Sequence, residues 1–354
     1  LDQCEELVCF CRPTPARAPQ TRADGSPADV ATALLAGRGP VRVGRWAFAL
    51  SVLDALDERL PRPADTAPHP DKRAWRQRYT TAADGLLAPV EAGRIGLPDA
   101  PKVSLIADLY PERDRLWLPV HALRELQRAS RLHEDGVHLA VLGHRLHPFW
   151  GTYAPTRTDH LELFATWLAG WKGARGRAID VGTGSGVLAL LLARAGFEDV
   201  LATDHNPNAL HSVRREVARR PQPPPIRTWQ GDLLPADGPL ADVIVFNPPW
   251  LVGPVGSPLD AALYSEDPDL VARFVERALP RLAPGGRLVL VFSNIVELVQ
   301  PDHPHPIKAE LARDPARVRE IGVLRRKARG RALPDGRRQR TRERVEVWEL
   351  APTG

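Results

Sequence analysis

The chain has 354 residues, of which 43% are hydrophobic and 26% charged, and its formal net charge is +5. This composition is ordinary for a globular protein with room for two domains, and it excludes a disordered chain. No apolar run reaches the roughly 18 to 20 residues that a membrane span needs, and the N-terminus lacks a basic and then apolar signal pattern. We therefore expect a cytoplasmic protein that does not enter a membrane.

Methionine is absent, and the three cysteines, Cys4, Cys9 and Cys11, lie within the first eleven residues. No histidine lies near enough in sequence to complete a zinc site of the C-x-x-C type. Unless distant residues supply the missing ligands, the cysteines are expected to be reduced thiols. We predict no metal site.

Residues 1–135 predict a separate, smaller and mainly helical domain that recognises the substrate. The first 40 residues are rich in Pro, Ala, Gly and charge, which favours loosely ordered chain around one short helix. Apolar spacing predicts the helices, and a short apolar run predicts a strand. The helices are expected at 28–36, 44–60, 71–89 and 119–130, and the strand at 103–109.

Residues 136–158 predict a hairpin and linker between two domains. The pattern is strand, glycine-containing turn and strand, then an extended segment with Pro155 that leads to a helix at 159–169. From there to residue 354, strands and helices alternate. This alternation predicts an α/β domain with a doubly wound, mostly parallel sheet.

The segment Ala178–Gly186, AIDVGTGSG, predicts a strand, a glycine turn and the start of a helix. Gly182, Gly184 and Gly186 alternate in this turn, and glycines are needed where backbone passes close to a ligand. The dinucleotide pattern G-x-G-x-x-G requires a third glycine at position 187, where the chain has valine. The turn therefore predicts a binding loop for a different small molecule.

Asp180 is the acidic residue just before the glycine turn. A second acidic residue, Asp204, directly follows the strand predicted at 197–203 and lies 24 residues after Asp180. A carboxylate at the end of the second strand can accept hydrogen bonds from both hydroxyls of a ribose. We therefore predict that Asp204 binds a ribose and that His205 and Asn206 line the same turn.

The segment 242–250, DVIVFNPPW, begins with a predicted strand. Asn247, Pro248, Pro249 and Trp250 follow at the carboxyl end of this strand. An exocyclic NH₂ group is a poor nucleophile because its lone pair is delocalised, so both N–H groups need positioned acceptors. The Asn247 side-chain oxygen and the Pro248 carbonyl can accept them, and two prolines fix the turn. Trp250 offers a flat face for stacking.

These motifs resemble those of class I S-adenosylmethionine (SAM)-dependent methyltransferases, from about Asp159 to Leu350. The glycine loop resembles their first motif, and N-P-P-W resembles the N/D-P-P-Y/F/W motif of amino-methyltransferases, which methylate planar nitrogens. The resemblance implies a Rossmann-like domain with an antiparallel last strand. It also implies SAM as methyl donor, S-adenosyl-L-homocysteine as product, and Asp232 as partner of the adenine amino group. The implied cofactor-binding residues are Asp180, Gly182, Thr183, Gly184, Gly186, Asp204, His205, Asn206, Asp232, Leu233 and Asn247.

The hairpin and linker resemble those of the glutamine N5-methyltransferases that modify release factors. In that family a proline-rich loop with an acidic residue lies over SAM, and the matching positions are Pro155, Thr156, Arg157 and Asp159. Thr156 and Arg157 are therefore further implied cofactor contacts. An ordinary linker with Asp159 as a helix N-cap is the alternative interpretation.

Basic residues concentrate near the C-terminus, where residues 324–344 hold ten Lys or Arg against Asp335 and Glu343. The segment Arg325 to Arg344 could follow a phosphate backbone, or it could be a solvated loop between two strands. Three functions follow from the sequence. The first is N-methylation of a protein amide, most simply a glutamine. The alternatives are methylation of an amino group on an RNA or DNA base, and a SAM-binding module without turnover.

Overall fold

The computed structural model describes residues 15–63, 69–111, 113–153, 155, 157–253, 263–329 and 342–353, with residues 69–73 described by their backbone alone. The chain folds into two compact units, and the division between them falls between Glu134 and Asp135. The three cysteines and Thr156 lie outside the described residues.

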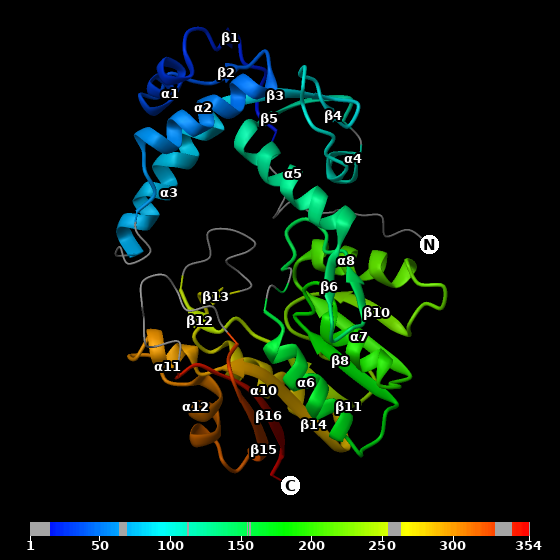
Figure 1. Cartoon of the computed structure of the whole chain (residues 1–354). Helices are drawn as coiled ribbons and strands as arrows, with labels where there is room; N and C mark the ends of the chain where they lie inside the picture. The colour runs from blue at the N-terminus through cyan, green and yellow to red at the C-terminus, as the bar shows by residue number, and fades with distance from the viewer. Residues whose placement is uncertain are drawn as a thin grey trace. The chain divides into compact units, whose positions relative to one another are not determined.

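The N-terminal unit combines helices with a small sheet (Figure 1). Its helices are α1 (Pro27–Leu35), α2 (Trp46–Arg59), α3 (His69–Asp84), α4 (Leu105–Leu109) and α5 (Val120–Asp135). Its strands are β1 (Thr21–Arg22), β2 (Val41–Arg42), β3 (Leu86–Glu91), β4 (Arg94–Ile95) and β5 (Arg115–Pro119). The central strand β3 pairs in parallel with β2 and antiparallel with β4 and β5. Helices hold more residues than strands, as the sequence predicted.

Two local predictions in this unit were wrong. The strand expected at 103–109 is the helix α4, and the buried residues Val103, Ile106 and Leu109 recur every three positions, a helical spacing. The helix expected at 71–89 ends at Asp84, because Gly85 interrupts it and the apolar run that follows forms the buried strand β3.

The C-terminal unit contains a seven-stranded sheet in the order β10-β9-β8-β11-β14-β16-β15. Its strands are β8 (Arg177–Val181), β9 (Asp199–Asp204), β10 (Ile226–Gln230), β11 (Ala241–Phe246), β14 (Leu282–Ser293), β15 (Val318–Lys327) and β16 (Arg344–Pro352). The first five strands in this order pair in parallel, and β16 lies antiparallel between β14 and β15. The doubly wound, Rossmann-like fold with an antiparallel last strand is confirmed.

Helices cover both faces of this sheet (Figure 1). They are α6 (Asp159–Gly170), α7 (Val187–Arg194), α8 (Pro207–Ala218), α10 (Leu270–Ala278), the 3-10 turn η1 (Leu279–Arg281), α11 (Ile295–Val299) and α12 (Pro306–Arg313). Because side chains alternate along a strand, β11 directs Val243 and Val245 to the core under α6 and α7, and Ile244 and Phe246 to the core under α10. Two short pairs complete the unit, β6 (Val137–Leu139) with β7 (His144–Leu146) and β12 (Leu251–Val252) with β13 (Tyr264–Ser265).

The predicted hairpin at 136–158 is confirmed as the antiparallel pair β6 and β7, and it is anchored to α8. The backbone N–H of His147 donates to the Glu216 carboxylate at 3.2 Å, and that of Phe149 donates to the Ser212 hydroxyl at 3.1 Å. The hairpin therefore holds the linker next to the sheet edge where β8 and β9 end.

Parallel pairing brings the carboxyl ends of three strands to one edge. Val181 of β8 pairs with Thr203 of β9 on one side and with Phe246 of β11 on the other. The next residues of each strand are therefore neighbours, which places the glycine loop, Asp204 and Asn247 together.

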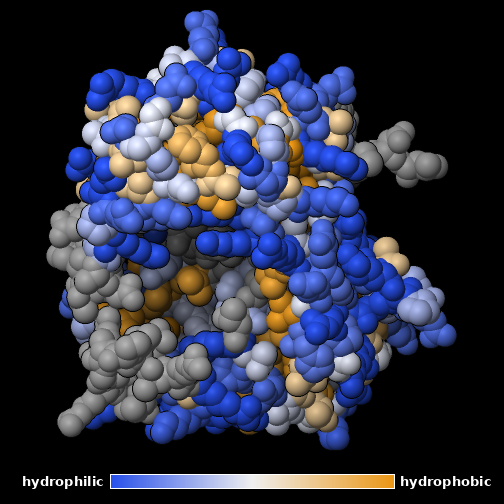
Figure 2. Space-filling model, turned by 45° about the horizontal axis from the view of Figure 1, so that its top comes forward, coloured by the Kyte–Doolittle hydropathy of each residue, from blue (hydrophilic) through white to orange (hydrophobic). Residues whose placement is uncertain are grey.

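Hydrophilic side chains dominate the face drawn in Figure 2. No helix in the described part of the chain is long and apolar enough to cross a membrane. Large apolar side chains that are exposed among the described residues are few and scattered.

Candidate functional site

A cavity of 780 Å³ lies at the carboxyl ends of β8, β9, β10 and β11. Its wall is built by the loops that follow these strands, by the linker and by the first turn of α6. The predicted residues that line it are Asp180, Gly182, Thr183, Gly184, Asp204, His205, Asn206, Asp232, Leu233, Asn247 and Pro249. Arg157, Gly186, Pro248 and Trp250 do not line this cavity.

The glycine loop is held by the carboxylate of Asp180. One oxygen accepts from the Thr183 hydroxyl at 2.7 Å and from the backbone N–H of Ala189 at 2.9 Å. Ala189 is the third residue of α7, and the N-cap of this helix is Gly186, which has no side chain to cap it. Asp180 therefore supplies the cap from the preceding strand.

The other oxygen of Asp180 is buried and has no hydrogen-bond partner among the described residues. Burial raises the pKa of Asp180 to about 7, although the bonds from Thr183 and Ala189 lower it, and the nearby carboxylate of Asp204 raises it further. A positively charged ligand in the cavity would favour the ionised form.

The three glycines of the loop all have positive φ angles, 61° at Gly182, 53° at Gly184 and 85° at Gly186. A Cβ atom at Gly186 would lie 2.9 Å from Val213, so this glycine serves the packing of α7 against α8. At Gly184 a Cβ atom would meet nothing within 4 Å, because this residue faces the cavity. Gly184 thus leaves room for a ligand.

Asp204 is buried and bonded to the loop. Its oxygens accept from the backbone N–H groups of Gly184 at 2.9 Å and Asn206 at 2.8 Å. Each carboxylate oxygen can accept a second bond, so both retain capacity for a ribose hydroxyl. Burial raises the pKa of Asp204 and outweighs these two bonds, which lower it. The Asn206 side chain caps α8.

Asp232 lies at the cavity wall with its carboxylate between two arginines. Arg273 and Arg277 approach it at 2.8 and 3.0 Å. Leu233 has a φ of 59°, and its carbonyl accepts from the buried Thr203 hydroxyl at 2.5 Å. Sequence reasoning missed Arg273, because the helix that carries it begins 38 residues after Asp232.

The N-P-P-W segment forms a wall between this cavity and a second pocket of 270 Å³. Asn247 faces the first cavity, whereas Pro248 and Trp250 face the second, and Pro249 lines both. The indole N–H of Trp250 donates to the Asn247 side-chain oxygen at 3.1 Å. This bond fixes the orientation of the amide that the sequence predicted to hold the acceptor.

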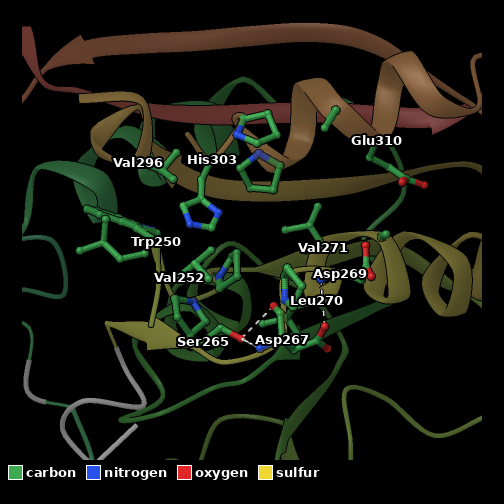
Figure 3. A pocket seen from close by; sticks show the side chains of 18 of the residues that line it. Trp250, Val252, Ser265, Asp267, Asp269, Leu270, Val271, Val296, His303 and Glu310 are labelled. Carbon is green, nitrogen blue, oxygen red and sulfur yellow. Dashed lines mark hydrogen bonds between the residues drawn. The ribbon is translucent and has the colours of Figure 1, made fainter. Parts of the chain in front are cut away.

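The second pocket is mainly apolar, and Trp250 lies at one end of it, with Asp269 and Glu310 at the other (Figure 3). The carboxylate of Glu310 binds Arg313 and Arg317. Trp250 is half-buried and also contacts Phe292, at 6.5 Å between ring centroids. Its ring is therefore part of the wall of this pocket.

Arg157 of the linker is half-buried between two carboxylates, those of Asp159 at 2.9 Å and Glu343 at 2.7 Å. Its guanidinium carbon lies 5.9 Å from the centre of the Trp250 ring. In the basic segment, residues 330–341 lie outside the described residues. Arg325 pairs with Glu346, and Arg326 and Arg329 pair with Glu162.

His160 also lines the large cavity, and sequence reasoning assigned it no role. It is the second residue of α6 and is 3% exposed. A lone histidine after an expected helix start carries no distinguishing pattern, so only the fold brings it to the site.

Residues 162–300 match the family model of the methyltransferase small domain. The match lies within the C-terminal unit and covers less than half of the chain, so this unit is similar to methyltransferase small domains. The matched segment begins in α6 and includes the glycine loop, Asp204 and the N-P-P-W segment. No group of three or more potential metal ligands occurs among the residues that the structure describes.

Three curated relatives are similar to parts of this chain. The ribosomal protein L11 methyltransferase of Pelotomaculum thermopropionicum is 34% identical over 122 residues, which cover 34% of this chain and 33% of that protein. The tRNA1(Val) (adenine(37)-N6)-methyltransferase of Tolumonas auensis is 32% identical over 131 residues, 35% of this chain and 55% of that protein. The release factor glutamine methyltransferase of Deinococcus radiodurans is 40% identical over 126 residues, 32% of this chain and 44% of that protein. The chain thus spans between a third and about half of the length of these relatives.

Replacing Asp180 by asparagine should change how the stability of the ligand-free protein depends on pH. The folded pKa of about 7 exceeds the ordinary 3.8, so the folded wild type binds more protons than the unfolded chain between these values. The contribution of this carboxyl group to the free energy of unfolding is therefore fully present below about pH 4. It falls as the pH rises to about 7, by at most about 1.4 kcal/mol per pH unit. Asparagine keeps an acceptor for Thr183 and Ala189 without a charge.

We expect Asp180→Asn to gain stability relative to the wild type across this pH window, with a constant difference above it. Urea unfolding at a series of pH values measures this difference. Parallel pH profiles for the two proteins would contradict the assignment of the raised pKa to Asp180.

Proposed function

We propose that this chain is a SAM-dependent N-methyltransferase whose acceptor is a planar amide nitrogen of a protein, such as a glutamine side chain. The observation that carries the proposal is that Asn247 and Pro249 face the same cavity as the glycine loop and Asp204. A methyl acceptor held at the end of β11 would therefore lie next to a cofactor bound along β8 and β9.

The residues of the cavity fit SAM. The unpartnered oxygen of Asp180 and the carboxylate of Asp204 place negative charge in a buried site, and Gly184 leaves space beside them. A ligand with positively charged ammonium and sulfonium groups reduces the cost of burying these carboxylates. When bound, SAM supplies an electrophilic methyl group, and Asp204 would hold its ribose.

Asn247 is suited to hold the acceptor because its position is fixed before the acceptor binds. Trp250 donates to the Asn247 oxygen, which has a second acceptor site free to receive an N–H of the substrate. Preorganised acceptors of this kind orient a weak nucleophile without requiring reorganisation during the reaction.

Two observations favour a protein acceptor over a nucleic acid. Arg325, Arg326 and Arg329, the described arginines at the start of the basic segment, are paired with carboxylates, which reduces the positive charge that they offer to phosphates. The names of two of the three relatives specify a protein acceptor, ribosomal protein L11 or a release factor glutamine, and the third names a tRNA adenine.

Labelling with tritiated SAM tests the proposed function. The wild-type protein is incubated with a total cell lysate, and the labelled product is divided between protease and nuclease digestion. We expect protease, and not nuclease, to release the label. Release by nuclease would establish a base amino-methyltransferase instead, and the absence of any label would leave only a SAM-binding module.

Asp204→Ala should weaken SAM binding by about 1 to 3 kcal/mol, because the change removes charge-assisted bonds to the ribose and the bond that holds Gly184. Isothermal titration calorimetry measures the affinity. Asp199→Ala is the matched control, since this carboxylate lies at the opposite end of β9 and pairs with Arg177 and Arg227. Wild-type affinity in Asp204→Ala would remove this residue from the binding site.

Asn247→Ala should lower kcat by about 10²-fold, the cost of removing one positioned hydrogen-bonding group, while SAM affinity stays near that of the wild type. Asn247→Asp should be milder, because a carboxylate still accepts N–H groups. Asn294→Ala is the control, since this residue bonds the backbone of Arg342 and Arg344 away from the cavity. Single-turnover methyl transfer to the labelled acceptor fraction measures the effect, and an unchanged rate in Asn247→Ala would refute the proposed role.

A further inference from the structure

His160 lies in the wall of the large cavity. The residue is the second of α6 and is almost fully buried. A buried ionisable side chain that faces a binding cavity needs a partner or a function, because burial without either costs free energy.

One ring nitrogen of His160 faces a fixed carboxylate. Its Nδ1 is buried, without a hydrogen-bond partner in the described chain, and lies 3.7 Å from Oδ1 of Asp159, which also lacks one. Oδ2 of Asp159 accepts from the Arg157 guanidinium at 2.9 Å and from the backbone N–H of Arg329 at 3.0 Å. One oxygen of Asp159 is thus held by two hydrogen bonds, and the other oxygen faces the His160 ring.

The carboxylate of Asp159 beside Nδ1 favours the tautomer of the His160 ring that carries its proton on Nδ1. The distance of 3.7 Å exceeds that of a hydrogen bond, but a small rotation of the ring brings Nδ1–H within reach of the carboxylate. With the proton on Nδ1, the lone pair is on Nε2. Burial opposes ionisation of Asp159, but the contacts with His160 and Arg157 outweigh it and hold the pKa of the carboxyl below its usual value. The carboxylate therefore stays charged and stabilises an imidazolium.

A short series of contacts joins His160 to the proposed acceptor site. The His160 and Trp250 rings meet edge to face, with centroids 5.3 Å apart and planes at 87°. Trp250 in turn donates to Asn247 at 3.1 Å. His160 and Asn247, which both line the large cavity, therefore contact the same tryptophan.

We propose that His160 accepts the proton that the methylated nitrogen must lose. This inference rests on the proposed N-methyltransferase function. The acceptor nitrogen forms a bond to the methyl carbon as the bond from that carbon to sulfur breaks, and the electron pair of the broken bond stays on sulfur. As positive charge develops on the nitrogen, its proton passes to Nε2 of His160 in the same step, so loss of this acceptor slows methyl transfer itself. The imidazolium is paired with Asp159 and releases the proton to solvent when the products leave.

Several charged groups lie near His160 or line the same cavity. Arg157 of the linker is paired with Asp159 and Glu343. Charged groups from the other elements that line the cavity are the carboxylates of Asp180, Asp204, Asp232, Glu266 and Asp267, the Arg273 guanidinium and the exposed imidazole of His205. The carboxylate that lies against the His160 ring is that of Asp159, 3.7 Å from Nδ1, and it is the partner of the imidazolium formed in the reaction.

The pairing of His160 with Asp159 can be tested without any methyl acceptor. In protein labelled with ¹⁵N-histidine, His160→Gln assigns the ring signals of His160 by their disappearance. At neutral pH and above, we expect the Nδ1–H tautomer with an unprotonated Nε2. The opposite tautomer, with the proton on Nε2, would overturn the proposal.

Kinetics then separate proton transfer from cofactor binding. We expect His160→Gln to lower the single-turnover rate with the labelled acceptor fraction by about 10²-fold, at the lower end of what a positioned proton acceptor contributes. The affinity for SAM should change by less than about threefold. The pH dependence of the rate should differ between the wild type and the variant. Added imidazole should restore part of the rate in His160→Ala.

His305→Gln is the matched control, because His305 is a buried imidazole beside Glu346 at 3.2 Å and lines neither cavity. It should keep the wild-type pH profile, and its rate should not respond to imidazole. A wild-type rate in His160→Gln, or a loss explained fully by weaker SAM binding, would overturn the role of His160 and leave the proposed function intact. A wild-type protein that transfers no methyl group to either fraction would overturn both.

Discussion

The site depends on the hydrogen bonds that the buried carboxylate of Asp180 accepts. The turn after β8 must pass through three glycines with positive φ, and such a turn has little side-chain packing to hold it. Asp180 supplies this constraint, since one of its oxygens binds both Thr183 in the loop and Ala189 at the start of α7. Its second oxygen is buried and has no hydrogen-bond partner among the described residues, so Asp180 both orders the loop and leaves an acceptor in the cavity wall.

The wall between the two pockets gives the N-P-P-W segment a role beyond that of its individual side chains. Proline has a fixed φ and no N–H, so two consecutive prolines after β11 hold the chain in one direction at the sheet edge. As a result Asn247 and Trp250, three residues apart, face different pockets while remaining joined by a hydrogen bond.

The antiparallel edge of the sheet also contributes to the site, although it lies on the far side of β14 from the glycine loop. Glu349 of β16 accepts from the Trp167 indole of α6 at 2.9 Å, and Glu343, just before β16, binds Arg157 at 2.7 Å. Helix α6 is thereby attached to the last strand of the chain. Because α6 carries His160 into the cavity, the C-terminal strand helps to position a residue that lies almost 200 positions earlier.

The sequence by itself determined the alternation of strands and helices in the C-terminal unit, the hairpin, and the side chains that share one sheet edge. Gly184 and Asn247 follow strands and Asp204 ends one, and local patterns of apolar residues, glycine and proline identify strand ends. Parallel topology then brings such ends together without further information. Local reasoning failed at Val103–Leu109, where a short apolar run is compatible with either a strand or a helix.

Only the tertiary structure decided which groups pair across long separations. The contacts of Asp232 with Arg273 and of Arg157 with Glu343 depend on side-chain directions in the packed fold. No spacing in the sequence encodes them, because charged residues are frequent and any of them is a possible partner. The fold selects one set of partners, since each buried charge must meet an opposite charge or a hydrogen bond in the place where the backbone holds it.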